Sequence, residues 1–398
     1  MTDARRLPGL AEAWDQLIDD ATPGAVFRSG AWLVPWWSHF GAGKELCIYT
    51  ARRNGRLVGV LPAYRLRTAF GYRQLRLMGD GLVGSDYLGV VAGRPDLQAV
   101  TEALSRALLT EEADLAFEGL TDDEPLITSV KAAARARRLP CAVQPLASCP
   151  VVRVPGDFQM WLRGRPHGAG AQLRRRLRWL ERQSDFRIVM LQDERDIAES
   201  LPILWRLHAA AWARRGGSSV ELGGAASTRF QWDSALALAR RGWARLFLLY
   251  VAGAPRAALY GFEQAGWFAY YQSGYDPSWS RRSLGRVILG AALQHAFERG
   301  LSEFDFLRGD ENYKWLFASK RRYVVRLRAA LSVPAVPSCV LDQSWAGAKW
   351  LAREFLPPPS REWVHRQQRR LRRWTSARRL GGGPANPGWG GGEVRVQK

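Results

Sequence analysis

The stretch SGYDPSWSRRSLGRVILGAALQHAFERG, residues 273–300, leads from the end of a predicted strand into a predicted helix at 285–299. Apolar residues recur along this helix at amphipathic spacing, so we expect one face to pack on a sheet. The start of a helix carries unpaired N–H groups and the positive end of the helix dipole, and Gly285 lets a ligand approach the backbone. With Arg282 beside it, this turn fits a phosphate or pyrophosphate group. An ordinary glycine turn with a surface arginine fits the pattern equally well.

The segments around this stretch predict a mixed α/β chain in which one order of elements occurs twice. The second half contains a three-stranded meander over 244–275, the helix at 285–299, a short strand at 303–307, a helix at 311–318 and a final strand at 322–331. The first half contains strands at 45–51, 56–67, 73–79 and 86–92, a helix at 96–109, a strand at 114–117 and a helix at 123–138. Asn54-Gly55 is a strong hairpin turn signal. Both halves share the order strands, helix, strand, helix, which predicts two like domains.

The length of 398 residues also favours more than one domain, because a domain holds about 150 residues. We predict an N-terminal domain at 1–150, a second domain at 151–332, a helical basic extension at 333–380 and a disordered tail at 381–398. Hydrophobic residues make up 47% of the chain and charged residues 24%. This composition is typical of a globular protein and excludes a largely disordered one.

Charge is the strongest compositional signal, because the formal net charge is +21. Such a surface attracts phosphates, nucleic acid or acidic lipid. Only six of the 58 basic residues are lysines, so a GC-rich genome is an alternative reason for the many arginines. Residues 361–398 hold ten basic and two acidic side chains, and we expect this tail to meet an anionic membrane surface.

Metal and disulfide chemistry have little support in the sequence. The four cysteines form no CxxC pair and the five histidines show no HxxxH spacing, so we expect no metal cofactor. No run of about 18 apolar residues occurs, and the N-terminus carries acids where a signal peptide needs an apolar core. We therefore expect a cytoplasmic protein, with peripheral attachment to the inner membrane surface through the basic tail.

The order of elements, with Arg282-Ser283-Leu284-Gly285-Arg286 at the loop, resembles the GNAT acyltransferases and their Q/R-x-x-G-x-G/A signature. Val287 departs from the signature, because the family prefers Gly or Ala there. The resemblance implies that the pantetheine arm of an acyl-coenzyme A enters between the strand ending near Gly274 and the strand at 303–307. It assigns the phosphates of this co-substrate, acetyl-CoA or another acyl-CoA, to Arg281, Arg282, Ser283, Leu284, Gly285 and Arg286.

A narrower likeness is to the CelD-like, BioF2-type acetyltransferase branch of that superfamily. The stretch FDFLRGDENYKWLFA, residues 304–318, carries it, and the likeness extends over about residues 27–330. It implies acyl transfer to an amine or hydroxyl of a small molecule, glycan or peptide, in exopolysaccharide or cell-envelope synthesis. The branch also resembles the Fem family of aminoacyl-tRNA-dependent peptidyl transferases, which are built from two GNAT-like halves.

Acyl transfer needs a base, a stabiliser of the oxyanion and a proton donor for the leaving thiolate. The candidate bases are Glu263, Asp305, Asp310 and Glu311. Glu311 is our preferred base or amine-binding group, and Asp305 is a second base if it faces the cleft rather than solvent. The GNAT resemblance suggests Tyr313 as the proton donor. Lys314 binds phosphate or carboxylate, or stabilises the oxyanion as the Fem resemblance suggests. A helix-start acid, a packing tyrosine and an exposed lysine are the ordinary alternatives.

A further candidate is the helix at 171–183, which carries leucines on one stripe and five arginines elsewhere: Arg174, Arg175, Arg176, Arg178 and Arg182. Such a charged face is usually solvated. Because guanidinium groups offer fork-like donors, a wall for anionic groups is the alternative.

The first half lacks a comparable phosphate turn. Residues 92–96 read AGRPD, which places proline and aspartate where a phosphate would lie, so we predict a degenerate, non-catalytic copy that shapes an acceptor cleft. Three functions stay open. They are an acyl-CoA-dependent N- or O-acyltransferase, an aminoacyl-tRNA-dependent transferase with tRNA as partner, and a non-catalytic protein that binds anionic surfaces.

Overall fold

The structure is a computed structural model that describes residues 1–18, 24–68, 71–81, 83–154, 156–214, 224–337 and 339–340. The α-helices are α1 (Leu7–Ile18), α2 (Gly30–Phe40), α3 (Leu97–Leu108), α4 (Pro125–Ala136), α5 (Phe158–Arg163), α6 (Ala169–Leu180), α7 (Glu194–Arg214), α8 (Ala225–Arg240) and α9 (Leu284–Glu298). The strands are β1 (Glu45–Arg53), β2 (Arg56–Arg67), β3 (Arg73–Leu77), β4 (Val91–Ala92), β5 (Asp114–Thr121), β6 (Cys141–Arg153), β7 (Arg187–Leu191), β8 (Ala244–Val251), β9 (Ala254–Gln264), β10 (Trp267–Tyr275), β11 (Glu303–Asp305) and β12 (Lys320–Ala329). Two short 3₁₀ helices border the site described below, η4 (Pro277–Arg282) and η5 (Lys314–Leu316).

Tight two-residue turns set the register of the hairpins. Between β1 and β2, Asn54 and Gly55 have φ of 51° and 80°, and Arg53 faces Arg56 across the turn. Positive φ at both central residues belongs to the turn type whose twist matches antiparallel strands, and asparagine followed by glycine tolerates it best. The hairpin predicted from Asn54-Gly55 is therefore confirmed.

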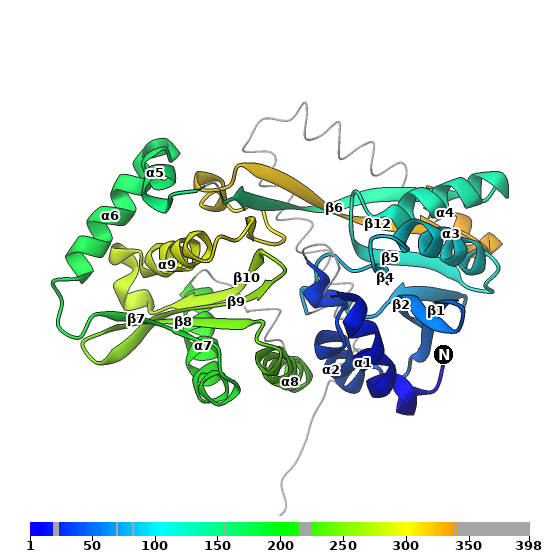
Figure 1. Cartoon of the computed structure of the whole chain (residues 1–398), viewed down its shortest axis with the longest axis horizontal. Helices are drawn as coiled ribbons and strands as arrows, with labels where there is room; N and C mark the ends of the chain where they lie inside the picture. The colour runs from blue at the N-terminus through cyan, green and yellow to red at the C-terminus, as the bar shows by residue number, and fades with distance from the viewer. Residues whose placement is uncertain are drawn as a thin grey trace, which may run out of the picture. The chain divides into compact units, whose positions relative to one another are not determined.

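The strands form one mixed sheet within the described residues, in the order β1-β2-β3-β5-β12-β6-β11-β10-β9-β8-β7, with β4 paired to β2 (Figure 1). The two parallel pairs are β3 with β5 and β10 with β11. The mixed α/β fold predicted from the sequence is confirmed.

Strand exchange joins the two halves of the sheet. The last strand of the second half, β12, lies between β5 and β6 of the first half, and β6 in turn lies between β12 and β11. The ladder of β6 and β12 runs from Lys320 opposite Val151 to Ala329 opposite Cys141. The boundary predicted near residue 150 thus falls inside a strand, and separating the halves would break this ladder.

Helices cover both faces of the β8–β10 meander, with α9 on one face and α7 and α8 on the other (Figure 1). Each face has its own apolar core, so Phe304 and Phe306 lie in one core and Leu307 in the other, as strand alternation predicts. On β10, a Cβ added to Gly274 would lie 2.2 Å from the backbone nitrogen of His208. Only glycine there lets α7 pack directly on the sheet.

Three predicted elements differ from the structure. The helix predicted at 311–318 is only the 3₁₀ turn η5, because Lys314 folds back onto the preceding loop, as described below. The strand predicted at 303–307 ends at Asp305, and Leu307 adopts a φ of 54°. The strand predicted at 86–92 is reduced to β4, because Tyr87 and Gly89 have φ of 59° and 151°. The described residues end at Val340. The rest of the extension predicted at 333–380 and the whole tail predicted at 381–398 lie outside them.

Candidate functional site

The parallel strands β10 and β11 separate shortly after they begin. They pair only at Trp267 with Glu303, Phe268 with Phe304 and Ala269 with Asp305. Beyond Ala269, β10 continues to Tyr275 along β9, with a register shift between Tyr270 and Gln272. The edge of β10 that faced β11 therefore has no strand partner over 270–275 within the described residues. Its backbone N–H and C=O groups are available to a ligand lying between the strands.

Hydroxyl groups line the start of this opening. Tyr270, the first residue of β10 beyond the paired part, hydrogen-bonds Ser273, and Tyr313 donates to the Tyr270 hydroxyl at 3.5 Å. His208 of α7 lies behind this edge, where its Nδ1 is 2.7 Å from the Ser273 carbonyl oxygen. The structure thus places the predicted proton donor Tyr313 beside the separated strands.

Lys314 is buried, although an exposed lysine was one reading of its position. Its ammonium group donates to the carbonyl oxygens of Phe306 and Arg308, each at 3.2 Å, and lies 2.9 Å from Glu311 Oε2. Gly309 has a φ of 130°, and an added Cβ would lie 2.4 Å from that Glu311 oxygen. The glycine, glutamate and lysine of the predicted motif therefore form one cluster that holds the loop after β11. The Glu311 side chain is 56% exposed, so its carboxylate can meet an incoming molecule.

Asp305 is neither cleft-facing nor solvated, because its side chain is fully buried. Oδ2 accepts hydrogen bonds from Tyr87 at 2.8 Å, Trp267 at 3.3 Å and Arg322 at 2.7 Å, and Oδ1 accepts from the Leu307 N–H. Burial raises the pKa of Asp305 to about 6, against the opposing charge of Arg322. Both oxygens are occupied, so this carboxylate stabilises the start of the opening and has no direct path to a substrate.

A second contact ties the same loop to the first half of the chain. The Arg308 backbone N–H donates to Asp86 Oδ2 at 2.9 Å, and its guanidinium reaches Asp86 Oδ1 and the Ser85 carbonyl oxygen, both at 2.5 Å. Asp86 is fully buried. One wall of the opening is therefore held by residues more than 200 positions earlier in the chain.

The predicted phosphate turn lies at the other end of β10, where η4 leads into α9. Ser283 has a φ of 53° and makes no side-chain cap, and the N–H groups of Leu284 and Gly285 find no acceptor in the described part of the chain. A Cβ added to Gly285 would come no closer than 3.4 Å to Tyr275, so the fold itself does not require glycine. Val287, which departs from the signature, is a buried core residue. Leu284 is buried, whereas Gly285 is partly exposed, so the turn presents the backbone of Gly285, which suits an anion.

Arginines surround this turn. Arg281 and Arg282 are exposed at the end of η4, Arg286 is half-buried on the first turn of α9, and Arg176 of α6 lies near enough to Arg286 for their charges to interact. Arg282 stacks on the Trp179 ring of α6, with its guanidinium carbon 3.7 Å from the ring centroid. Within the described ranges, no carboxylate lies within 4 Å of Arg281, Arg282 or Arg286. The turn therefore keeps its positive charge uncompensated by the protein.

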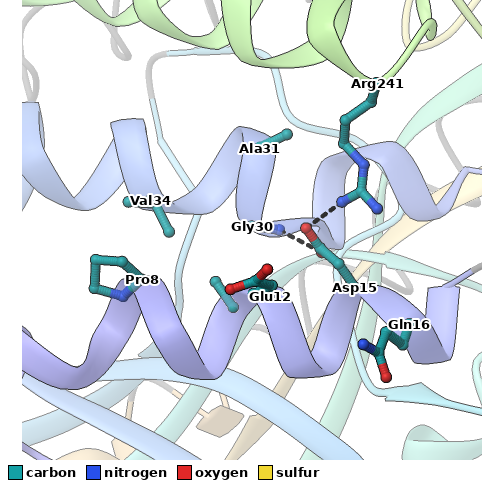
Figure 2. A pocket seen from close by; sticks show the side chains of 9 residues that line it. Pro8, Glu12, Asp15, Gln16, Gly30, Ala31, Val34 and Arg241 are labelled. Carbon is teal, nitrogen blue, oxygen red and sulfur yellow. Dashed lines mark hydrogen bonds and ion pairs between the residues drawn. The ribbon is translucent and has the colours of Figure 1, made fainter.

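A separate pocket of about 440 Å³ lies outside every predicted motif, between α1, α2 and the end of α8 (Figure 2). Its buried acid, Asp15, accepts hydrogen bonds from the Gly30 N–H at 2.7 Å and from Arg241. Burial raises the pKa of Asp15. Both carboxylate oxygens are engaged in joining helices, so Asp15 serves packing rather than chemistry.

Among the residues that the structure describes, no three His, Cys, Asp or Glu side chains are gathered in a way that could hold a metal ion. No helix in the described part of the chain has both the length and the apolar composition needed to cross a bilayer.

Comparisons with known proteins agree with this geometry. Residues 169–315, from α6 to η5, match the family model described as acetyltransferase (GNAT) domain. The crystal structure of FemX is similar, with a TM-score of 0.56 and 11% identity over 79% of this chain and 95% of that one. The structure of L-PGS from Bacillus licheniformis has a TM-score of 0.50 and 14% identity over 83% of this chain and 95% of that one. At such identities the likeness concerns the fold. A comparison with curated protein sequences gave no match.

Residues 169–315 of the second half therefore match a GNAT domain in sequence, and the fold around them is GNAT-like. The strand exchange between the two halves and the similarity in fold to FemX fit a Fem-like arrangement of two GNAT-like halves.

Several residues that build the site were not found from the sequence. Tyr87 and Arg322 hold Asp305, and Asp86 holds Arg308, from segments far away in the chain. Their local sequence carries no periodic or motif signal for these contacts, since a buried pair of distant residues forms only in the tertiary structure.

Proposed function

We propose that this protein is an acyl-coenzyme A-dependent N- or O-acyltransferase whose acyl donor lies along β10. The observation that carries the proposal is the combination of two features on one strand. The edge of β10 opens over 270–275, and the strand ends at the uncompensated positive turn of Arg282 and Gly285. Donor phosphates at this turn would place the pantetheine arm along the open edge, where backbone groups can hydrogen-bond its amides.

The residues around the opening suit the chemistry of acyl transfer. A nucleophilic amine or hydroxyl must lose a proton as it attacks the thioester carbonyl, and the carbon–sulfur bond then breaks to release a thiolate. Glu311 supplies an exposed carboxylate, steadied by Lys314, that can take the proton of the nucleophile. Tyr313, linked to Tyr270, can return a proton to the thiolate. Backbone N–H groups of the unpaired β10 edge supply hydrogen bonds to the developing oxyanion.

The acceptor is proposed to be a glycan, peptide or small molecule of exopolysaccharide or cell-envelope synthesis, and the basic tail is proposed to hold the protein at an anionic membrane surface. Mass spectrometry of acceptor mixtures incubated with acetyl-coenzyme A tests the first part. An acetylated amine and an acetylated hydroxyl differ in their resistance to mild base, so the product also separates N- from O-transfer.

An aminoacyl-tRNA-dependent transferase is the second candidate, since the net charge of +21 also suits nucleic acid. Isothermal titration of the full chain with acetyl-coenzyme A and with charged tRNA separates the two. The first proposal expects binding of the thioester, weakened roughly tenfold or more by Arg282→Ala, because a charge-assisted contact is lost. Arg206→Ala, an exposed change on α7, is the matched control. Binding of tRNA alone would favour the second candidate, and binding of neither would leave only the non-catalytic reading.

A further inference from the structure

Helix α6 is fixed against the phosphate turn by close packing. A Cβ added to Gly290 of α9 would lie 2.6 Å from the Leu173 side chain, so the two helices touch without a gap. At its other end, α6 places Trp179 under the Arg282 guanidinium, and the Trp179 ring centroid is 6.3 Å from that of Trp279 in η4. The last turns of α6 therefore form a side wall of the turn that leads into α9.

Arg176 lies one helical turn before Trp179, on the same face of α6. Burial, and after it the nearby charge of Arg286, lowers the pKa of Arg176. The packing of α6 on α9 thus holds two guanidinium groups close together in a half-buried position. None of Arg176, Arg282 and Arg286 has an ion-pair partner among the described residues.

Two other partly buried arginines of this chain each form ion pairs with carboxylates. Arg322 contacts Glu303 and Asp305, and Arg245 contacts Glu263, each at 2.7 to 3.0 Å. Like charges held together without a counterion repel each other, and the cost grows when water is partly excluded. An anionic ligand would therefore relieve the repulsion within the group of Arg176, Arg282 and Arg286.

We infer that Arg176 and Arg286 form a subsite for a phosphate monoester of the acyl donor, separate from its pyrophosphate. The inference rests on the proposed function and deepens it. The N–H of Gly285 at the start of α9, with Arg282, suits a pyrophosphate. Two additional guanidinium forks beside them match the oxygens of one more phosphate. Coenzyme A carries such a group on its ribose, and dephospho-coenzyme A lacks only that group.

Isothermal titration of the full chain with coenzyme A and with dephospho-coenzyme A tests the subsite. The wild-type protein should bind coenzyme A more tightly by roughly tenfold or more, as expected for charge-assisted contacts. In Arg176→Ala this ratio should fall toward one, because coenzyme A loses affinity while dephospho-coenzyme A does not. Arg286→Ala should give the same result from the other helix. Arg206→Ala, exposed on α7 and outside the predicted anionic wall, should keep the wild-type ratio.

The outcomes of this titration distinguish a failure of the subsite from a failure of the proposed function. Equal binding of both nucleotides by the wild-type protein, or a wild-type ratio in both Arg176→Ala and Arg286→Ala, overturns the subsite and leaves acyl-coenzyme A dependence intact. Failure of both nucleotides to bind the wild-type protein removes the proposed function and the subsite together. Thermal unfolding of each variant checks that the ratio is measured on folded protein.

Discussion

The hydroxyl of Tyr87 donates a hydrogen bond of 2.8 Å to Oδ2 of Asp305, across 218 positions of sequence. Tyr87 belongs to the first half of the chain, and Asp305 ends the strand β11 at which the opening begins. Arg322 of β12 donates to the same oxygen at 2.7 Å. One buried carboxylate therefore joins the first half, the candidate site and the exchanged strand.

Breaking this junction should destabilise the protein strongly. Arg322→Ala leaves the buried Asp305 carboxylate without its counterion, which costs about 3–5 kcal/mol in the free energy of unfolding. Tyr87→Phe removes one hydrogen bond and should cost about 1–2 kcal/mol. Urea unfolding measures both. Arg321→Ala, the exposed neighbour on β12, should change the free energy by less than about 0.5 kcal/mol. Equal effects of the two arginine variants would contradict the junction.

The Glu263 cluster predicts a defined loss of stability in acid. Burial would raise the pKa of Glu263, but the hydrogen bond from His295 and the charge of Arg245 outweigh it and lower the pKa to about 2. The folded state then holds fewer protons than the unfolded state between the folded and unfolded pKa values, so stability rises with pH there. Compared with Glu263→Gln, the wild-type protein should be more stable above the usual glutamate pKa.

This advantage should shrink as pH falls from about 4.5 toward 2. Denaturant midpoints of both proteins at pH 3, 4, 5 and 6 measure it. Glu298→Gln, an exposed change on α9, is the control and should show no such trend. A difference between wild-type and Glu263→Gln proteins that grows in acid would contradict the role assigned to Glu263.

Gly309 in the loop after β11 and Gly285 in the phosphate turn should respond oppositely to alanine. A Cβ at Gly309 would clash with Glu311 and Lys314, and the residue has a φ of 130°. Gly309→Ala should therefore lower the free energy of unfolding by about 1–3 kcal/mol. A Cβ at Gly285 fits the helix, and Gly285→Ala should keep or raise stability, by up to about 1 kcal/mol. If Gly285 is open for a donor phosphate, its alanine variant should nevertheless bind coenzyme A more weakly. Thermal unfolding and titration of the same samples decide this, and unchanged affinity in Gly285→Ala would contradict a ligand at the turn.

Tyr313→Phe tests the proton donor. Losing a general acid should lower kcat by roughly 10²-fold with little change in KM for the acyl donor. Stability should change little, because the substitution keeps the ring and the hydrogen bond to Tyr270 is long, at 3.5 Å. Tyr250→Phe, on β8 away from the opening, is the matched control. Steady-state kinetics with an identified acceptor measure both variants, and a wild-type kcat in Tyr313→Phe would assign the proton transfer elsewhere.

Local patterns in the sequence already determined a large part of this protein. Amphipathic spacing predicted α9 to within a residue at each end, Asn54-Gly55 predicted the first hairpin, and the alternation of Phe304 and Phe306 with Leu307 predicted which side of the sheet each would face. These features depend on neighbours within a few residues, because helix and strand periods repeat over that distance. The phosphate turn at Arg282 and Gly285 was visible for the same reason.

Only the tertiary structure decided the rest. The exchange of β6 and β12 depends on pairing between strands about 180 residues apart, and no local period records it. Asp305 looked like a candidate base until Tyr87 and Arg322 closed around it. Lys314 looked like a residue on a helix surface, but its ammonium group turns inward to two carbonyl oxygens and shortens that helix to one turn. Local sequence therefore predicted which residues carry charge or could act in catalysis. Burial among distant partners decided which of those side chains stay accessible to a ligand.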